Sequence, residues 1–552
     1  MPRRYNKNQM EENMRLLNVG KMKELEKQAD SAGFTYAEMM RIAGEGIAEF
    51  IMQRIGNESK NNAVGLIGKG NNGGDTLIAI TTLQKAGWTT LALLVGERGK
   101  HDQLLAAYTS SGGVIVEMPV LKDFQREAIS EGIILDGVYG TGFHPPLPGA
   151  VIDALKSVRL ALPNFDWIAV DCPSGVDCET GEVSAGTQKA RWTICLEAVK
   201  TGLMTETGFP YCGELAVVEL GLARYDASKG TIDDIVLDDQ LLRDTLPVRK
   251  TFTHKGSYGK TMVVGGSVNY SGAPVLAGRA AYAVGTGLVQ VAVPESIGQV
   301  APAGSPELTW LILEDGGGVI SELAADTLKE NIASAHSLVI GPGMGREATT
   351  QKFIARLLLE AAIPQQVRTG FPGMTSGNAN QRVNRVLPPL VVDADGLYHL
   401  SREGAWQDKC NARLVLTPHP GEMALLTGRS VEEIQADRLR VAKEFARMWN
   451  QVVVLKGALT VVVEPGGRAA IVPIASSSLA KAGTGDVLAG MIGGLLAQSL
   501  EPWQAASVGA YLHARAGLAA AEMVGCSESV QASDVIRAIP RVYRSLKTID
   551  LP

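Results

Sequence analysis

Short apolar runs that end in turns rich in glycine and aspartate recur along this chain, with helical segments between them. The first half contains the runs AVGLIG, TLALLVG, GIILDGVYG and WIAVDCPSG, and the second half contains KTMVVGG, LVQVAVP, SLVIGPG, PLVVDADG, RLVLTPHPGE and QVVVLKG. Uninterrupted apolar runs are typical of strands buried on both faces, and strands that alternate with helices pair in parallel. The sequence therefore predicts an α/β fold with a parallel sheet in each half.

The 552 residues of the chain exceed what one compact core usually holds. Between Leu222 and Pro247 the alternation weakens and the chain becomes polar and acidic, which indicates a linker. We predict a flexible tail over residues 1–12, an N-terminal domain over 13–230, a linker over 231–247 and a C-terminal domain over 248–548. Gln365–Pro388 has no clear periodicity and predicts an unusually long surface loop.

Charge and composition narrow the classes of partner. The net charge is -6, with basic and acidic residues interspersed, which gives a nucleic-acid partner little electrostatic support. The longest apolar run, Val487–Ala497, is well short of the roughly 20 residues that span a bilayer. The six cysteines form no metal-binding spacing, so we expect free thiols in a reducing compartment. We expect a cytoplasmic homo-oligomer that binds small molecules, without a nucleic-acid or membrane partner.

The turn Gly68–Gly73 fits the pattern G-x-G-x-x-G between a strand and a helix. Glu97 follows the next strand, where an acidic residue could bind a ribose, so this motif alone would suggest a dinucleotide-binding oxidoreductase. The turn is unusually polar, however, because Asn71, Asn72 and Asp75 add amide and carboxylate groups to its glycines. It is therefore suited to bind more than a pyrophosphate.

Two later strand ends, Asp136–Gly142 and Val170–Asp177, are polar in the same way. Because the carboxyl ends of parallel strands meet at one edge of a sheet, the three turns are expected to line one crevice. Asn72, Asp136 and Ser174 offer hard oxygen ligands that suit an alkali or alkaline-earth cation. The alternative is that these residues only cap helices and turns.

In the second half, Lys481–Asp486 precedes the helical run VLAGMIGGLLA. Small residues at a helix N-terminus leave backbone N–H groups free to bind a phosphate. The Asp486 carboxylate would repel a static phosphate, so we interpret it as a base that takes a hydroxyl proton; the alternative is an ordinary helix cap. Lys456 could hold nucleotide phosphates as a point charge, and His419, between two prolines, is either a ligand contact or structural.

The motifs GKGNNGGD, DGVYGTG and IAVDCPSGVDCETGEV resemble the NAD(P)H-hydrate epimerase domain of bifunctional NAD(P)H-hydrate repair enzymes, over Asn13–Gly221. The resemblance implies a Rossmann-like three-layer domain that binds potassium (K+) through Asn72, Asp136 and Ser174. It also implies contacts with the hydrated dinucleotide from Asn71, Asn72, Gly73, Gly74, Asp75, Gly140, Thr141, Gly142, Phe143, His144, Pro145, Pro146 and Asp171. Thr76 stands where the family usually has glycine.

Asp171 leaves a strand end beside a turn of backbone N–H groups. Epimerisation needs only the assisted loss and return of a hydroxyl group, and a partly buried carboxyl can have a pKa close to the working pH. We therefore predict that Asp171 is the acid/base of the N-terminal domain. The alternative is that it only binds ribose hydroxyls.

Seven motifs of the second half, among them VIGPGMG, VVDADGL, LTPHPGEMALL, VVVLKGALT and AGTGDVLAGMIGGLLA, resemble in their order the ribokinase-like, ADP-dependent NAD(P)H-hydrate dehydratase domain, over Thr253–Ile539. The resemblance implies that Ala273, Gly343, His419 and Asp486 contact the hydrate and that Asp486 is the catalytic base. It implies nucleotide contacts from Lys456, Gly457, Ala458, Leu459, Thr460 and Gly485. Ala482 replaces a glycine of the family pattern.

Together the two resemblances imply one repair enzyme. The N-terminal domain would interconvert the R and S hydrates of NADH and NADPH. The C-terminal domain would phosphorylate the S hydrate with ADP, in the presence of Mg2+, and eliminate phosphate to give NAD(P)H and AMP. The alternative hypothesis is a small-molecule kinase whose N-terminal half is a ligand-binding module without catalysis.

Overall fold

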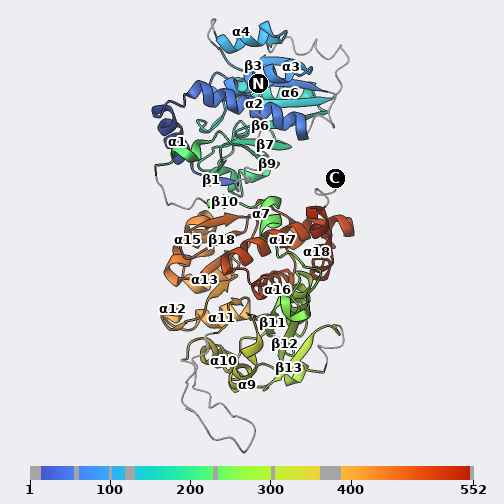
Figure 1. The fold of residues 1–552 in the computed structure, drawn as a ribbon. Helices are drawn as coiled ribbons and strands as arrows, with labels where there is room; N and C mark the ends of the chain where they lie inside the picture. Colours follow the sequence, from blue (N-terminus) through green and yellow to red (C-terminus); the bar gives the residue numbers. More distant parts are fainter. Residues whose placement is uncertain are drawn as a thin grey trace, which may run out of the picture. The chain divides into compact units, whose positions relative to one another are not determined.

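The computed structural model of the protein describes residues 14–54, 61–98, 102–117, 131–227, 234–299, 305–360 and 387–547. The predicted tail over residues 1–12, and the predicted loop Gln365–Pro388 except for its last two residues, lie outside these ranges. The chain divides into two compact units, Met1–Val236 and Leu237–Pro552 (Figure 1). Strand β10 (Asp234–Val236) and helix α7 (Asp239–Thr245) lie in the segment that we predicted as a linker.

The first unit is built on a seven-stranded sheet in the order β4-β3-β2-β5-β6-β7-β9, in which all neighbours are parallel. Its strands are β2 (Asn62–Ile67), β3 (Thr89–Leu94), β4 (Val114–Glu117), β5 (Gly132–Gly137), β6 (Phe165–Val170), β7 (Trp192–Leu196) and β9 (Glu214–Val218). Two short strands lie outside this sheet, where β1 (Arg15–Leu17) pairs in parallel with β8 (Val199–Lys200).

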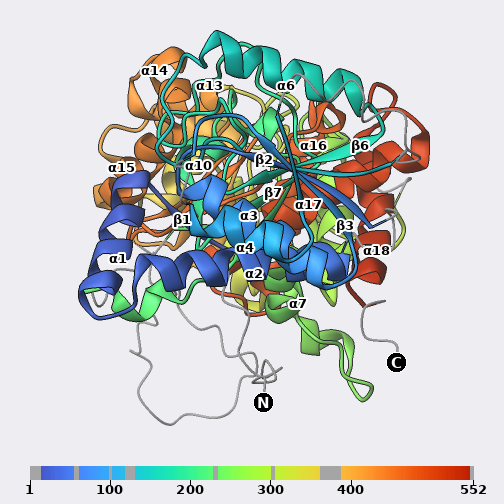
Figure 2. The ribbon, with the colours of Figure 1, turned by 90° about the horizontal axis from the view of Figure 1, so that it is seen from above.

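Helices cover both faces of this sheet and form two separate cores (Figure 2). The helices are α1 (Val19–Ser31), α2 (Tyr36–Arg54), α3 (Asn71–Lys85), α4 (Gln103–Ser110) and α6 (Gly149–Ala161). Along β2, Ala63 and Ile67 belong to the core that includes α1, α2 and α3. Val64 and Leu66 point the other way, into the core that includes α6. The strand is therefore buried on both faces, which is why its sequence is uninterrupted by polar residues.

The second unit contains a nine-stranded arrangement in the order β13-β12-β11-β14-β15-β16-β17-β18-β19. Its first seven strands are parallel, and β18 and β19 continue it antiparallel. The strands are β11 (Lys260–Val264), β12 (Leu288–Pro294), β13 (Thr309–Leu313), β14 (Ser337–Ile340), β15 (Leu390–Val392), β16 (Leu414–Leu416), β17 (Val452–Leu455), β18 (Val461–Val463) and β19 (Ala469–Ile471). The prediction of an α/β fold with parallel sheets is confirmed in both units.

Helices also lie on both sides of the second sheet, with α13 and α15 on one side and α16, α17 and α18 on the other (Figures 1 and 2). They are α8 (Ala273–Ala283), α9 (Ala324–Asn331), α10 (Ala348–Leu358), α11 (Asp395–Ser401), α12 (Trp406–Lys409), α13 (Pro420–Thr427), α14 (Val431–Ala436), α15 (Arg438–Trp449), α16 (Thr484–Ala497), α17 (Pro502–Val524) and α18 (Ala532–Lys547). Among the helices in the described ranges, none combines the length and the apolar character needed to cross a bilayer.

Helix α16 is the central helix of the second unit, because every residue from Val487 to Ala497 is buried. Glycines let it approach its neighbours closely. A Cβ added at Gly490 would overlap the carbonyl oxygen of Ala277 in α8, and one added at Gly493 would overlap the side chain of Val339 in β14. The long apolar run of the sequence is therefore a helix enclosed by protein.

We expect Gly490→Ala to lower the free energy of unfolding of the second unit. Alanine favours a helix over glycine by about 1 kcal/mol, but the added methyl group must displace the backbone of α8, and overpacking of this kind costs about 1–3 kcal/mol. Urea unfolding monitored by circular dichroism would measure the change. Gly404→Ala is the matched control, because a Cβ at Gly404 meets no atom within 4 Å. Equal midpoints for the two variants would contradict the expectation.

Candidate active sites

The first candidate site lies where the strand order of the first unit reverses, between β2 and β5. Ligands of open parallel sheets bind at this point, outside the carboxyl ends of the strands. Asn72, in the first turn of α3, donates from its side-chain amide to the carbonyls of Tyr139 and Val170, at 2.9 Å each. One amide thus joins the turn after β2 to the turns after β5 and β6, so the structure brings the three predicted turns together.

Asp136 and Ser174 form the buried centre of this site. Asp136 is fully buried, and its carboxylate accepts hydrogen bonds from the Ser174 hydroxyl at 2.6 Å, the Ser174 backbone N–H at 3.1 Å and the Trp167 indole at 3.1 Å. Burial raises the pKa of Asp136, while the hydrogen bonds from Ser174 and Trp167 oppose this effect. The backbone N–H of Tyr139 donates to the Ser174 hydroxyl at 2.9 Å, which ties the two turns together.

Groups that a cation could use lie close together here, and they bond to one another. The Asn72 amide nitrogen donates to the carbonyls of Tyr139 and Val170, and the Ser174 hydroxyl donates to the Asp136 carboxylate. A cation would bind the oxygen atoms of these groups, which are ligands that alkali and alkaline-earth ions prefer. In the described part of the chain no group of three or more His, Cys, Asp or Glu residues could hold a metal ion.

A buried ion pair lies beside these turns. Asp171 has a φ of 65°, in the left-handed region, and its carboxylate accepts from the side chain of Lys200 and, at 3.1 Å, from the backbone N–H of Leu196. Lys200 is fully buried and also donates to the carbonyl of Leu196 at 2.9 Å. We did not predict Lys200, although a lysine within the apolar segment TICLEAVKTG was a signal for it.

The carboxyl groups of Asp75 and Glu26 interact electrostatically with this ion pair. Burial raises the pKa of Asp75 well above its ordinary range, and the negative charges of Asp171 and Glu26 add to the rise, against the effect of Lys200. Burial likewise raises the pKa of Glu26 on α1, with a further contribution from Asp171. Glu26 carried no signal that we recognised in the sequence. The first site therefore combines an ionised pair with carboxyl groups that retain protons more readily than usual.

The predicted substrate loop, residues 140–146, runs along the same edge. His144 is exposed, and its Nδ1 lies 2.8 Å from the Asp177 carboxylate. Phe143 is buried in the core on the α6 side of the sheet, so only its backbone could reach a ligand. Gly140 lies against the side chain of Asn72, since a Cβ added there would be 3.2 Å from its carboxamide carbon, whereas Gly142 faces open space. Thr141 is half-buried, and Pro145 and Pro146 are joined by a cis peptide bond.

The glycines in and directly after the G-x-G-x-x-G turn allow close packing of the backbone, in addition to any contact with a ligand. A Cβ at Gly68 would overlap the carbonyl of Val138, and one at Gly73 would overlap the carbonyl of Gly68. A Cβ at Gly74 would lie 2.6 Å from the sulfur of Met40. Gly73 and Gly74, predicted as substrate contacts, can therefore offer only backbone groups. Asn71, the first residue of α3, is exposed.

One expectation about the cysteines is wrong. Cys172 and Cys178 form a disulfide, whereas we expected six free thiols. The chain turns between the two cysteines, where the backbone N–H of Val176 donates to the carbonyl of Pro173 at 3.0 Å. Cys195, Cys212, Cys410 and Cys526 are free.

The second candidate site lies at the start of α16. Gly483, with a φ of 88°, precedes the helix, and the Thr484 hydroxyl donates to the carbonyls of Leu479 and Lys481, at 2.8 Å each. The first backbone N–H groups of a helix have no carbonyl partner within it and carry partial positive charge. The amides of Gly485 and Asp486 are therefore suited to bind the oxygens of a phosphoryl group.

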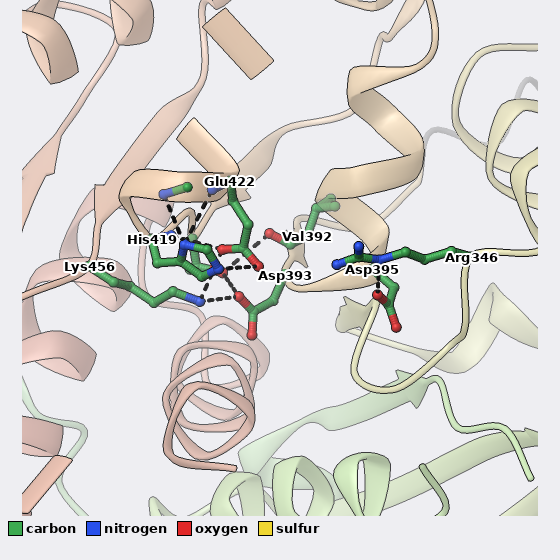
Figure 3. A network of polar contacts seen from close by, with 9 residues as sticks. Arg346, Val392, Asp393, Asp395, His419, Glu422 and Lys456 are labelled. Carbon is green, nitrogen blue, oxygen red and sulfur yellow. Dashed lines mark hydrogen bonds and ion pairs between the residues drawn. The ribbon is translucent and has the colours of Figure 1, made fainter. Parts of the chain in front are cut away.

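An ion pair joins the ends of two strands, β15 and β17, that lie on either side of β16 (Figure 3). Lys456, after β17, is 2.6 Å from a carboxylate oxygen of Asp393, after β15, and 3.6 Å from one of Glu422. The Thr417 hydroxyl donates to the same Asp393 oxygen at 2.8 Å. A Cβ at Gly485 would be 3.5 Å from the Lys456 ammonium nitrogen, so this residue joins the start of α16 to the ion pair.

Burial and these neighbouring charges together set the pKa of Asp486. Burial raises the pKa of Asp486 to about 7, and the negative charge of Asp393 adds to the rise, while Lys456 opposes it. Burial alone would lower the pKa of Lys456, but Asp393 and Glu422 outweigh burial and raise it. At neutral pH, Lys456 is thus a cation and Asp486 exchanges its proton readily.

His419 lies at the N-terminus of α13. Its Nδ1 accepts from the backbone N–H groups of Gly421, at 3.0 Å, and Glu422, at 3.2 Å, so in the neutral ring Nε2 carries the proton. The Glu422 carboxylate accepts from the His419 backbone N–H at 2.8 Å (Figure 3). His419 is therefore a cap of α13, and the Nε2 of its exposed ring lies 3.5 Å from a carboxylate oxygen of Glu422.

The remaining predicted residues lie on three strand-end turns. Gly343, with a φ of 62°, lies next to Ala273, because a Cβ added at Gly343 would be 3.1 Å from that of Ala273. In the predicted nucleotide segment, Gly457 and Ala458 are exposed and the Thr460 hydroxyl donates to the carbonyl of Gly457 at 2.8 Å. Leu459 is buried, so its side chain belongs to the core.

Asp395 is the first residue of α11, two residues after Asp393. In the sequence it appeared only as part of the motif VVDADGL, and we predicted no role for it. Its carboxylate accepts from the Gly345 backbone N–H at 3.1 Å and from the Arg346 guanidinium at 3.2 Å (Figure 3). It thereby fixes the turn that carries Gly343.

Comparison with known proteins identifies the family. Residues 261–541 match the family described as NAD(P)H-hydrate dehydratase, and residues 36–202 match the YjeF-related protein N-terminus. The bifunctional NAD(P)H-hydrate repair enzyme of Moorella thermoacetica is 34% identical over 97% of both chains. The chain belongs to the family of bifunctional NAD(P)H-hydrate repair enzymes.

A second repair enzyme agrees with this assignment, and one solved structure is also similar to the chain. The bifunctional NAD(P)H-hydrate repair enzyme of Escherichia coli is 33% identical over 93% of this chain and 91% of its own. A crystal structure of the ADP/ATP-dependent NAD(P)H-hydrate dehydratase from Bacillus subtilis, co-crystallised with ATP and Mg2+, is 28% identical and covers 57% of this chain and all of its own, with a TM-score of 0.45. The resemblance that we inferred from the motifs is confirmed.

Asp486 should titrate close to neutrality. In difference infrared spectra, the carboxyl band of Asp486 should be half protonated at about pH 7, and Asp486→Asn identifies the band by removing it. Asp393→Asn should lower this pKa by about one pH unit or more, because a negative neighbour is lost. Asp408→Asn, an exposed position on α12, should leave it unchanged. A band that titrates below pH 5 in the unaltered chain would contradict the expectation.

Proposed function

We propose that the second unit dehydrates the S hydrate of NADH and NADPH with ADP as phosphoryl donor, and that the first unit interconverts the R and S hydrates. The observation that carries this proposal is Asp486, a carboxyl group with a pKa of about 7 beside the free amides of α16 and the cation of Lys456. Family membership supports the same pair of activities.

In the second unit, Asp486 takes the proton of the hydrate hydroxyl. The hydroxyl oxygen then attacks the terminal phosphorus of ADP, a phosphorus–oxygen bond forms, and the bond to the AMP oxygen breaks. The amides of Gly485 and Asp486 bind the oxygens that gain negative charge. The ring nitrogen then expels phosphate, the neighbouring carbon loses a proton, and the reduced nicotinamide ring is restored.

Lys456 and the residues around it hold the nucleotide in this scheme. The raised pKa of Lys456 keeps it a cation that attracts phosphate oxygens, and the exposed segment Gly457–Ala458 offers backbone groups to the nucleotide. Ala273, Gly343 and the Nε2–H of His419 contact the hydrate. Bound Mg2+ would neutralise part of the phosphate charge.

In the first unit, Asp171 acts as the acid/base for loss and return of the hydroxyl group. Lys200 holds the Asp171 carboxylate in one orientation and balances its charge. Burial raises the pKa of Asp75 well above its ordinary range, so this second carboxyl group retains a proton more readily than usual. Asn71 and the loop 140–146 hold the dinucleotide, and Asn72, Asp136 and Ser174 would hold K+.

The decisive assay supplies purified R and S hydrates with ADP, with ATP or without nucleotide. It follows the reduced-nicotinamide absorbance, and chromatography separates the epimers. Asp486→Asn should lower dehydration by about 100-fold or more, the usual range for a lost general base, and leave epimerisation intact. Asp171→Asn and Lys200→Met should do the reverse.

Asp408→Asn controls for a change of charge at the surface. Loss of both activities in a folded Asp486→Asn protein would contradict two independent sites. Unchanged epimerisation in Asp171→Asn would remove Asp171 from the mechanism, and failure to consume either hydrate would favour the small-molecule kinase.

Potassium should be required by epimerisation. With tetramethylammonium as the only monovalent cation, we expect the epimerisation rate to fall by about tenfold or more, or about 1.4 kcal/mol, and to recover when K+ is added. Ser174→Ala should be slow in both buffers, because the turn has lost one of its oxygens. Equal rates of the unaltered chain in both buffers would contradict a cation at this site.

A further inference from the structure

Arg438, the first residue of α15, lies against the turn that follows β17. Nη2 of its guanidinium donates to the carbonyl of Leu455 at 3.0 Å and to that of Lys456 at 3.2 Å. A Cβ added at Gly457 would be 2.8 Å from the same nitrogen, so a side chain at this position would displace the guanidinium. The arginine is therefore in direct contact with the backbone of the predicted nucleotide segment.

The next carbonyl of this turn is bound from within the segment. The Thr460 hydroxyl donates to the carbonyl of Gly457 at 2.8 Å. In a trans peptide unit the C=O and N–H groups point in opposite directions. The N–H groups of Gly457 and Ala458 share their peptide units with these bound carbonyls, so they point away from the groups that donate to the carbonyls. Successive backbone N–H groups on an exposed turn are suited to bind the oxygens of a phosphate.

The same turn carries the lysine of the second site. The Lys456 ammonium nitrogen lies 2.6 Å from the Asp393 carboxylate, and a Cβ at Gly485 would be 3.5 Å from it. The hydrogen bonds from Arg438 to this turn have a charged donor, and such bonds are roughly twice as strong as neutral ones. The half-buried guanidinium thus fixes the backbone that leads from β17 into the nucleotide segment.

We propose that Arg438 is a positioning residue of the second site: by binding the backbone carbonyls on either side of the Lys456 Cα atom, it directs the amides of Gly457 and Ala458 toward the phosphates of ADP. This inference rests on the proposed function. Arg438 does not touch the reacting atoms, and it acts on the nucleotide rather than on the hydrate. A segment that is already ordered binds its ligand more tightly, because no further order has to be imposed on binding.

Two substitutions test this role in the dehydration of the S hydrate. Arg438→Gln removes the guanidinium, and its side chain is about two bonds too short to reach either carbonyl. It should raise KM for ADP by about tenfold or more, because the turn must then be ordered on binding. The kcat and the KM for the hydrate should stay within about twofold. Arg438→Lys keeps the charge but loses the planar fork, so its KM for ADP should lie between the two.

The matched control is Arg440→Gln on the same helix. Arg440 is exposed and pairs with Asp437 and Glu444 at the surface of α15. The change of charge is the same, and all kinetic constants should stay within about twofold. Epimerisation, measured in each sample, reports the intact first unit. If Arg438→Gln is insoluble, Arg438→Lys carries the test and should raise KM for ADP by about threefold or more.

The outcomes separate this inference from the proposed function. A KM for ADP within about twofold of the unaltered chain would overturn the positioning role. An equal rise in the KM for the hydrate would overturn it too, because a general disturbance of the unit acts on both substrates. In either case the unaltered chain would still dehydrate the S hydrate. Failure of the unaltered chain to do so with ADP would instead overturn the function on which the inference rests.

Discussion

The buried contact between Lys456 and Asp393 is the interaction on which the second site depends. A buried charge is tolerated only when a partner and hydrogen bonds compensate it, and here Lys456, Asp393 and Thr417 compensate one another. The pair comes from the ends of β15 and β17, which the parallel sheet holds a fixed distance apart. Its net effect on Asp486 is to leave burial dominant, so that this carboxyl group titrates near neutrality.

The first unit meets a similar requirement with different residues. Asp171 and Lys200 form a buried pair, and the carboxyl groups of Asp75 and Glu26 have raised pKa values beside it. Both units thus use the edge of a parallel sheet to bring an ion pair and a protonatable carboxyl together. They differ in the third component: the second unit has the N-terminus of α16, whereas the first has the hydrogen-bonded side chains of Asn72, Asp136 and Ser174.

Much of both sites could be predicted because strand ends carry the functional residues. The alternation of apolar runs predicted that Asn72, Asp136 and Ser174 would meet, and they do. Lys200 and Glu26 escaped prediction, because each lies within a helix or an apolar segment and has no motif of its own. The disulfide between Cys172 and Cys178 escaped for a related reason, since the spacing matched no known pattern and only the reversal of the chain brings the residues together.

The sequence by itself determined the α/β class, the parallel sheets and the turns at which chemistry occurs, because continuous apolar runs and glycine-rich turns are local properties of the chain. It also determined family membership through the order of its motifs. Only the tertiary structure decided which charges face one another and how each group titrates. Lys456 is 63 residues from Asp393, and Lys200 is 29 residues from Asp171. Burial and neighbouring charge set a pKa, and both exist only once distant segments have packed.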